Sequence, residues 1–208
     1  MQLTYTTLKE MWVSFFRIKA YRIKFLFFFL LLLLTVLMLP RFFHYIEMRE
    51  GIVLNDYLLS RLPAYNVSLL LFALIWSVIG LALWQCIWNP KQCLLLLIAF
   101  TLLTLLRVAC LYFVELNAPP GLIVLQDPLS NFFYGTHFIT KDLFFSGHTA
   151  TMFLMYLWFQ KRSKKIFALA CTCIVGILLL VQHIHYSVDI VAAPVFTYLT
   201  FKLAKKIY

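Results

Sequence analysis

Long apolar runs, separated by short polar segments, recur along the whole chain. They cover about residues 21–39, 67–88, 92–114, 146–160, 166–184 and 188–203. A helix that crosses a membrane needs roughly 20 predominantly apolar residues, and it satisfies its backbone hydrogen bonds internally, as hydrocarbon requires. The pattern therefore predicts an all-α fold, in which a bundle of six transmembrane helices forms one integral membrane domain over residues 1–208.

The N-terminal segment, residues 1–20, has a different pattern. Its apolar residues recur at near-helical spacing beside charged ones, at Leu8, Trp12, Phe15 and Phe16. Such a pattern is typical of an amphipathic helix that lies on the membrane surface. The first span can extend back past Lys24 and Arg22, whose long side chains reach the interface. A cleaved signal peptide is less favoured, because Leu39-Pro40-Arg41 offers no small-residue cleavage site.

Turn-forming residues mark the connections between the runs. Residues 40–66 mix charges of both signs with aromatic residues, which predicts an interfacial loop with a short helix ending near Pro63. A tight turn is expected at Asn89-Pro90, because proline cannot continue a helix and pushes the preceding residue out of the helical region. The segment 115–145 holds Pro119-Pro120-Gly121, which is typical of a loop.

The composition excludes an ordinary soluble globule, because 63% of the residues are hydrophobic and 12% are charged, and the mean hydropathy is +0.90. The formal net charge is +10, yet the basic residues cluster beside apolar runs, where they meet anionic lipid headgroups. We therefore expect membrane lipids rather than nucleic acid as partners. The cysteines lie in or at the ends of apolar runs without the spacing of a zinc site, so they predict no metal centre.

Three basic clusters set the expected orientation. They lie before the first span, at residues 161–165 between the fourth and fifth spans, and after the sixth span, at Lys202, Lys205 and Lys206. With six spans, all three clusters fall on one side, which the positive-inside rule makes cytoplasmic. Both termini are then cytoplasmic, and residues 40–66, residues 115–145 and the turn at His185 face the opposite compartment.

Two polar segments between apolar runs carry the candidate chemistry. The segment Asp142-Leu-Phe-Phe-Ser-Gly-His-Thr149 brings Asp142, Ser146 and His148 together, and His185 lies four residues before Asp189. On a helix, that spacing places His185 and Asp189 on one face. A single histidine at the end of a span is more often an interfacial polar residue. Two histidines on the same side, one of them with a carboxylate, favour a functional site.

The residue types suit transfer of a phosphorus ester. An imidazole can attack phosphorus when a carboxylate orients it and stabilises the cation that forms, and a second imidazole can protonate the departing alkoxide. We expect His185 with Asp189 to be the nucleophilic unit and His148 to be the acid and base. No metal and no cofactor is implied, because imidazolium and Arg107 can supply positive charge to the transition state.

Arg107 lies eight residues before the 115–145 loop, or about 12 Å of helical rise below it. A charge at that depth faces the bundle interior or a watery cavity. We expect Arg107 to bind phosphate, and the alternative is an ion pair with Glu115 or another buried carboxylate. Asp142 and Ser146 are the other expected substrate-binding residues, which would position histidine and phosphate.

Together, the two polar segments resemble the third and fourth motifs of the sphingomyelin synthase family, a branch of the type 2 phosphatidic acid phosphatase superfamily. The matching residues are Asp142, Ser146-Gly147-His148-Thr149, His185-Tyr186-Ser187, Asp189-Ile190 and Phe201. The resemblance spans roughly the last two-thirds of the chain, more loosely before Asp142. It implies six spans, an exoplasmic site, and transfer of a phospho-headgroup from a glycerophospholipid to ceramide through a histidine-bound intermediate, with release of diacylglycerol.

The chain departs from the family pattern at several positions. Thr140-Lys141 stands where the animal enzymes have Cys-Gly, Pro194 stands where an aromatic residue is usual, and Ala204-Lys205 stands where Tyr-His closes the fourth motif. Leu179 lies where other branches of the superfamily carry a phosphate-binding arginine, which favours the transferase branch. The short chain without a soluble extension looks more like bacterial relatives than animal ones, so we expect a bacterial inner membrane protein.

The sequence therefore predicts a membrane phosphotransferase whose partners are a phospholipid donor and a lipid alcohol acceptor, either ceramide or another. A lipid phosphatase or phospholipase C-like hydrolase would use the same residues with water as the acceptor. From a different class, a lipid-binding or scrambling protein with a degenerate site is a further alternative, which the intact set of His148, His185 and Asp189 disfavours. The headgroup, the acceptor and the oligomeric state stay open.

Overall fold

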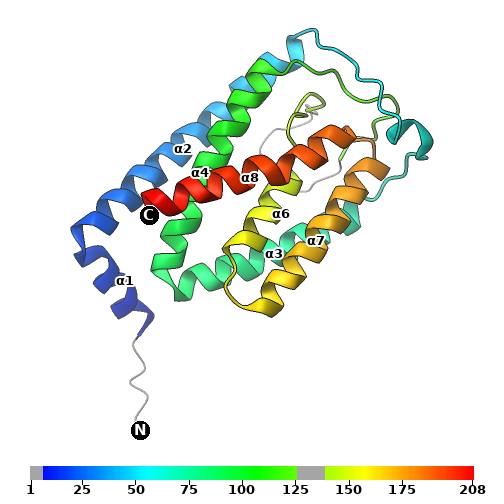
Figure 1. Cartoon of the computed structure of the whole chain (residues 1–208). Helices are drawn as coiled ribbons and strands as arrows, with labels where there is room; N and C mark the ends of the chain where they lie inside the picture. Colours follow the sequence, from blue (N-terminus) through cyan, green and yellow to red (C-terminus); the bar gives the residue numbers. More distant parts are fainter. Residues whose placement is uncertain (1–6, 126–138) are drawn as a thin grey trace.

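The computed structural model describes residues 7–125 and 139–208. In this part of the chain every regular element is helical apart from one isolated β-bridge, which confirms the all-α prediction. The helices are α1 (Leu8–Arg17), α2 (Lys19–Met48), the 3-10 helix η1 (Leu59–Arg61), α3 (Ser68–Trp88), α4 (Pro90–Phe113), α6 (Gly147–Trp158), α7 (Arg162–Val181) and α8 (Ser187–Ile207). Figure 1 shows them as a bundle joined by loops at both ends.

Among the described residues, five helices are long and apolar enough to cross a membrane, namely α2, α3, α4, α7 and α8. These helices indicate that the chain is an integral membrane protein. Helix α6 stands in the place of the predicted span 146–160, but its 12 residues rise only about 18 Å, against roughly 30 Å of hydrocarbon. The six-span count is not confirmed and stays a prediction.

Helix α2 is longer than the apolar pattern predicts. The predicted first span ends at residue 39, but α2 continues to Met48 with Pro40 inside it. Proline removes one helical hydrogen bond, and the packing of the following turns offsets that loss, since Phe43 and Ile46 are buried in a cluster with α4. The prediction that residues 41–48 belong to a loop was wrong, because tertiary burial outweighs the local effect of proline.

Helix α1 begins with reciprocal hydrogen bonds between Thr7 and Glu10. The Glu10 backbone N–H donates to Thr7 Oγ1 (3.3 Å), and the Thr7 N–H donates to Glu10 Oε2 (2.9 Å). Trp12 Nε1 donates to the carbonyl of Ile87 at the end of α3 (3.0 Å). Helix α1 lies within residues 1–20, where the sequence predicts an interfacial amphipathic helix, and that interfacial role stays a prediction.

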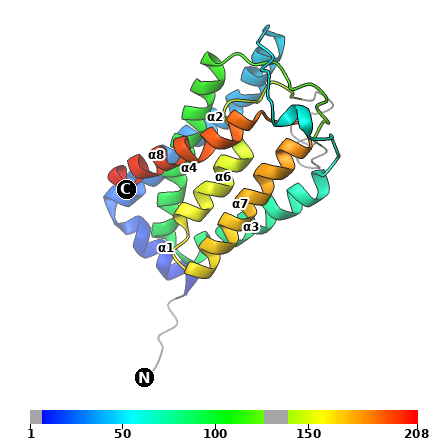
Figure 2. The ribbon, with the colours of Figure 1, turned by 45° about the vertical axis from the view of Figure 1, so that its right-hand side comes forward.

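The basic segments lie together at one end of the bundle. Lys24 Nζ, near the start of α2, donates to the carbonyls of Ile207 (2.7 Å) and Tyr208 (2.9 Å) at the end of α8. Lys164 Nζ, in the first turn of α7, donates to Gln85 Oε1 near the end of α3 (2.6 Å). Figures 1 and 2 show α1, the C-terminus and the α6–α7 turn at this end, and the long loops at the other.

Gln182 and His183 hold the loops at the opposite end. The buried Gln182 side chain accepts a hydrogen bond from the Val67 N–H (3.2 Å) and donates to Ser68 Oγ (2.8 Å). His183 follows with a left-handed φ of 55°, and its ring nitrogens lie 2.8 Å from the carbonyl oxygen of Pro120 and 3.0 Å from that of Leu62. Two separate loops are thereby fixed to the end of α7.

Helix packing brings the two polar segments together. Helix α6 packs against α7 and α8, and α4 packs against α2 and α8. The Ser146 N–H, just before α6, donates to the carbonyl of Asp189 on α8 (3.2 Å). Phe145 is fully buried and stacks on Phe196 of α8, with ring centroids 4.9 Å apart. The start of α6 therefore lies directly beside the start of α8.

Candidate active site

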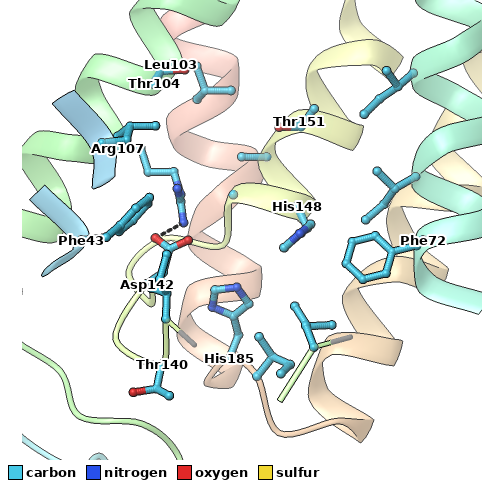
Figure 3. A pocket seen from close by; sticks show the side chains of 18 of the residues that line it. Phe43, Phe72, Leu103, Thr104, Arg107, Thr140, Asp142, His148, Thr151 and His185 are labelled. Carbon is cyan, nitrogen blue, oxygen red and sulfur yellow. Dashed lines mark hydrogen bonds and ion pairs between the residues drawn. The ribbon is translucent and has the colours of Figure 1, made fainter. Parts of the chain in front are cut away.

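A cavity of about 450 Å³ lies among α2, α3, α4, α6 and the turn before α8. Its polar end is lined by Arg107, Thr140, Asp142, His148 and His185 (Figure 3). Most of its other lining is apolar, including Val36, Leu39, Phe43, Phe72, Ile75, Trp76, Ile79, Phe100 and Leu103. A cavity with a large apolar part and a few convergent polar groups is typical of a ligand site.

Partly exposed side chains of α2 and α3 line the apolar part of the cavity. Val36 on α2 and Trp76 on α3 both line it, yet their exposed fractions are 45% and 43%. Both helices are long and apolar enough to cross a membrane. The apolar part of the cavity is therefore lined by helices that could cross a membrane, while the polar end lies near the loops.

His185 and Asp189 form a buried pair beside the cavity. Their side chains are 2% and 0% exposed, and His185 Nδ1 lies 3.3 Å from Asp189 Oδ2. Donation from Nδ1 to the carboxylate leaves the lone pair on Nε2. The other carboxylate oxygen, Oδ1, is buried with no hydrogen-bond partner among the described residues. The carboxylate of Asp189 thereby fixes the orientation of the His185 ring.

The start of α8 explains how this pair forms. Helix α8 begins at Ser187, so His185 precedes the helix, and Asp189 lies in its first turn. Asp189 Oδ2 accepts the backbone N–H of Tyr186 (3.0 Å) as well as facing His185. An acidic side chain in the first turn satisfies an unpaired N–H and interacts favourably with the helix dipole. The helix cap therefore holds the carboxylate where it meets the imidazole.

Tyr186 secures the backbone beside His185. Its side chain is fully buried, and its hydroxyl donates to the carbonyl of Asn117 (2.9 Å) and accepts the N–H of Leu54 (3.3 Å). Burial raises the pKa of Tyr186, and the negative charges of Asp189 and Asp56 raise it further. The hydroxyl therefore stays protonated and available as a donor at neutral pH.

Asp56, which lies far from α8 in the sequence, accepts hydrogen bonds from Ser187 at the start of that helix. Its carboxylate accepts the Ser187 N–H (2.6 Å) and the Ser187 hydroxyl (2.9 Å), and it also accepts the N–H groups of Leu58 (3.0 Å) and Leu59 (3.1 Å). Burial raises the pKa of Asp56, but these hydrogen bonds outweigh it and hold the pKa below its ordinary value. Ionised Asp56 thus anchors residues 56–59 to the helix that carries Asp189.

We expect the folded protein to lose stability in acid partly through Asp56. Because the pKa of Asp56 is lower in the folded chain, its contribution is fully present above the unfolded value of about 3.9 and is lost as pH falls through the folded pKa. Thermal unfolding of purified protein in detergent, measured from about pH 6 to pH 3, should therefore show a smaller loss in Asp56→Asn than in wild type. The exposed Glu50→Gln variant is the control, and equal acid profiles for wild type and Asp56→Asn would contradict the role of this carboxylate.

His148 lies in the first turn of α6 on another side of the cavity. The N-cap residue Ser146 precedes it, and Ser146 Oγ accepts the Thr149 N–H (3.4 Å). The His148 ring meets the edge of Phe72 on α3, with ring centroids 6.2 Å apart. Figure 3 shows the rings of His148 and His185 and the carboxylate of Asp142 around one space. The structure thus brings both predicted catalytic histidines to the same cavity.

Arg107 forms an ion pair with Asp142 rather than with Glu115. Its Nη2 donates to Asp142 Oδ1, and its Nε donates to the carbonyl of Phe145 (3.0 Å). Glu115 instead pairs with Arg49 (3.2 Å). The Arg107 side chain is 18% exposed and lines the cavity. Of the two alternatives for Arg107, the structure shows the ion pair, and it leaves the guanidinium in reach of a ligand.

Gly147 makes this position of Arg107 possible. A Cβ atom added at residue 147 would lie 2.7 Å from Arg107 Cζ and 2.8 Å from Nε. These separations are shorter than any ordinary contact, so a larger residue would displace the guanidinium. The glycine between Ser146 and His148 therefore serves close packing with Arg107.

The two other residues predicted to bind substrate, Asp142 and Ser146, have different positions relative to the cavity. Asp142 lines the cavity, whereas Ser146 is fully buried and acts as the N-cap of α6. The sequence predicted no supporting role for Asp56, or for Tyr186 beyond its place in the motif, because the partners of both side chains are far away in sequence. Within the described residues, no three His, Cys, Asp or Glu side chains gather as a metal site would require.

Comparison with known proteins adds to this geometry. Residues 141–207 match the family described as PAP2 superfamily C-terminal. The matched region contains Asp142, Ser146, His148, His185 and Asp189, and it extends through α8. The comparison supports the superfamily that the two motifs predict. No solved structure matches the chain.

Two curated proteins are similar to part of the chain. The phosphatidylcholine:ceramide cholinephosphotransferase 2 of Macaca fascicularis is 40% identical over 65 residues, and that of Homo sapiens is 38% identical over 65 residues. The aligned part covers 28% of this chain and 18% of each relative. The findings point to an enzyme that acts on lipids. Membership of the sphingomyelin synthase family and a bacterial source stay predictions.

Proposed function

We propose that the protein is a membrane phosphotransferase that moves a phospho-headgroup from a glycerophospholipid to ceramide or another lipid alcohol. The observation that carries the proposal is the cavity in which the His185–Asp189 pair, His148 and Arg107 surround one space at the end of an apolar chamber. Its polar end suits a phosphodiester, and its apolar part suits acyl chains. The named activity of the similar cholinephosphotransferases supports the same class of reaction.

In the first half of the reaction, His185 Nε2 attacks the phosphorus atom of the donor. A P–N bond forms, and the P–O bond to diacylglycerol breaks. His148, in its protonated form, delivers a proton to the departing oxygen, because an alkoxide is a poor leaving group. Asp189 stabilises the positive charge that develops on the His185 ring. Diacylglycerol then leaves, and the phospho-headgroup stays bound to His185.

In the second half, neutral His148 takes the proton of the acceptor hydroxyl. The acceptor oxygen attacks phosphorus, the P–N bond breaks, and His185 regains its lone pair. The new phosphodiester carries the acceptor in place of diacylglycerol. His148 thus acts as acid in one half and as base in the other, so both histidines finish in their starting protonation states.

Arg107 would supply positive charge to the phosphoryl oxygens. A planar guanidinium can bind two acceptors at once, and Arg107 already holds Asp142 and the carbonyl of Phe145. A phosphodiester in the cavity would accept hydrogen bonds from the same guanidinium that pairs with Asp142. Such preorganised charge in a site with little water is worth more than the same charge in solvent.

The donor and acceptor would reach the site from the membrane. Val36 and Trp76 line the cavity and are partly exposed, so an opening between α2 and α3 would let an acyl chain lie there while its headgroup meets the polar end. Both substrates are insoluble in water, so this route suits them. It would keep the chains in an apolar environment throughout the reaction.

The experiment that tests the proposal uses purified protein in detergent or vesicles. Labelled phosphatidylcholine, phosphatidylethanolamine and phosphatidic acid are each supplied with and without ceramide, and the products are identified by mass spectrometry. Diacylglycerol together with a ceramide phosphodiester, or with ceramide phosphate when phosphatidic acid is the donor, would support the transferase. Diacylglycerol with free phospho-headgroup, formed without ceramide, would support a hydrolase. No product from any donor would favour a lipid-binding protein.

We further propose that both termini are cytoplasmic and that the site faces the extracytoplasmic side. The three basic clusters lie at the end of the bundle opposite the cavity, which agrees with the positive-inside rule. In sealed cells, an impermeant thiol probe should label Tyr57→Cys at once and Ser163→Cys only after permeabilisation. Wild type serves as the control for its own cysteines. The reverse labelling pattern would place the site in the cytoplasm.

A further inference from the structure

Glu47, in the last turn of α2, holds the segment that leads into the site. Its Oε1 accepts the backbone N–H groups of Thr140 (2.5 Å) and Lys141 (2.7 Å), and its Oε2 accepts the Thr140 hydroxyl (3.0 Å). Lys141 Nζ also donates to the carbonyl of Arg49 just after α2. Two successive residues are thus tied to the end of one helix by backbone and side-chain hydrogen bonds.

The charge of Glu47 does not serve the stability of α2 itself. The C-terminus of a helix carries partial negative charge, so a carboxylate there is unfavourable. The Nη1 and Nη2 groups of the nearby Arg49 donate instead to the carbonyls of Leu111 and Tyr112 and to Glu115. The compensation comes from the donors of Thr140 and Lys141. The hydrogen bonds to Thr140 and Lys141 therefore explain the presence of a carboxylate at this position.

The held segment is directly followed by Asp142. Thr140 and Asp142 both line the cavity, and Asp142 pairs with Arg107 (Figure 3). A shift of the Thr140 backbone would carry Asp142 with it and so displace the guanidinium. Thr140-Lys141 is also a position at which the chain departs from the animal enzymes that it resembles, where Cys-Gly has neither this hydroxyl nor this ammonium group.

We propose that Glu47 is a positioning residue, which fixes the Arg107–Asp142 pair through Thr140 and Lys141. The proposal rests on the proposed phosphotransfer and adds to it a residue outside both motifs. Leu39 and Phe43, which lie on α2 before Glu47, line the same cavity. Through Glu47, α2 is linked to the polar end of the cavity as well as forming part of its apolar wall. The distance between the apolar wall and the expected phosphate site is thereby held constant.

The test compares turnover of a labelled phospholipid donor by purified wild type, Glu47→Ala, Glu47→Gln and the control Glu50→Ala, each taken as the folded fraction from size exclusion. Glu47→Ala should lower kcat by about 10-fold or more, as a small misplacement of a site does, while its KM changes by less than about 3-fold because the apolar chamber is intact. Glu47→Gln keeps an acceptor oxygen for both backbone N–H groups and should restore most of kcat. Glu50→Ala, on an exposed neighbouring carboxylate, should match wild type.

Glu47→Asp covers the case in which Glu47→Ala does not fold. Its shorter side chain keeps the charge but cannot reach both N–H groups, so kcat should fall while the thermal midpoint stays near that of wild type. A wild-type kcat in Glu47→Ala or Glu47→Asp would overturn the positioning role, as would a Glu47→Gln variant as slow as Glu47→Ala. Absence of turnover in wild type would instead overturn the proposed function, and this inference with it.

Discussion

His185→Ala is expected to lower phospholipid turnover by about 10⁴-fold or more, as loss of a covalent nucleophile does in other enzymes. In the proposed reaction no bond to phosphorus can form without His185 Nε2. The cavity would still bind the donor, because its apolar walls and Arg107 are unchanged. The second readout is the protein itself, since we expect mass spectrometry to detect an acid-labile phospho-headgroup adduct on wild type and none on His185→Ala.

Two further variants make this result specific. His185→Gln keeps a polar side chain beside Asp189 and should be equally inactive, which separates chemistry from the cost of exposing a buried carboxylate. His44→Ala removes an exposed histidine of α2 that does not line the cavity, and it should retain full turnover. Retained turnover in folded His185→Ala would rule out the covalent mechanism.

His148→Ala is expected to lower turnover of a natural phospholipid by about 10² to 10⁴-fold, the usual effect of removing a general acid or base. The loss should depend on the leaving group. A phosphodiester with a nitrophenol leaving group needs no proton, so His148→Ala should still load His185 with the phospho-headgroup at a rate near that of wild type. Transfer from loaded His185 to the acceptor should remain slow, because that half requires a base.

The leaving-group dependence distinguishes His148 from a residue that only packs against Phe72. The diacylglycerol and nitrophenol donors are compared in wild type and in His148→Ala, with nitrophenol release followed in a single turnover. Equal losses for both donors would contradict the role of general acid and would indicate that His148 orders the site. A loss confined to the natural donor would support the assignment.

The sequence predicts the contact between His185 and Asp189, but the structure shows a different reason for it. The four-residue spacing indicates that His185 and Asp189 meet on a helix, and they do lie 3.3 Å apart. However, His185 precedes α8, and the pair forms because Asp189 caps the first turn of that helix. Local spacing was enough to predict the contact, whereas the support from Asp56 depends on a loop more than a hundred residues earlier, since Asp56 and Ser187 are 131 residues apart.

By itself, the sequence determined the helical class, the positions of most apolar helices and the two segments that carry polar residues, because these follow from periodicity and from neighbours along the chain. The partner of Arg107 was decided only by tertiary structure. Asp142 lies 35 residues away, and Gly147 admits the guanidinium because α4 and α6 pack in one particular register. The same holds for Glu47, since α2 had to continue past Pro40 before its carboxylate could meet Thr140. Which side chains meet across helices depends on the length, end and packing of each helix, and burial of the whole bundle sets these together.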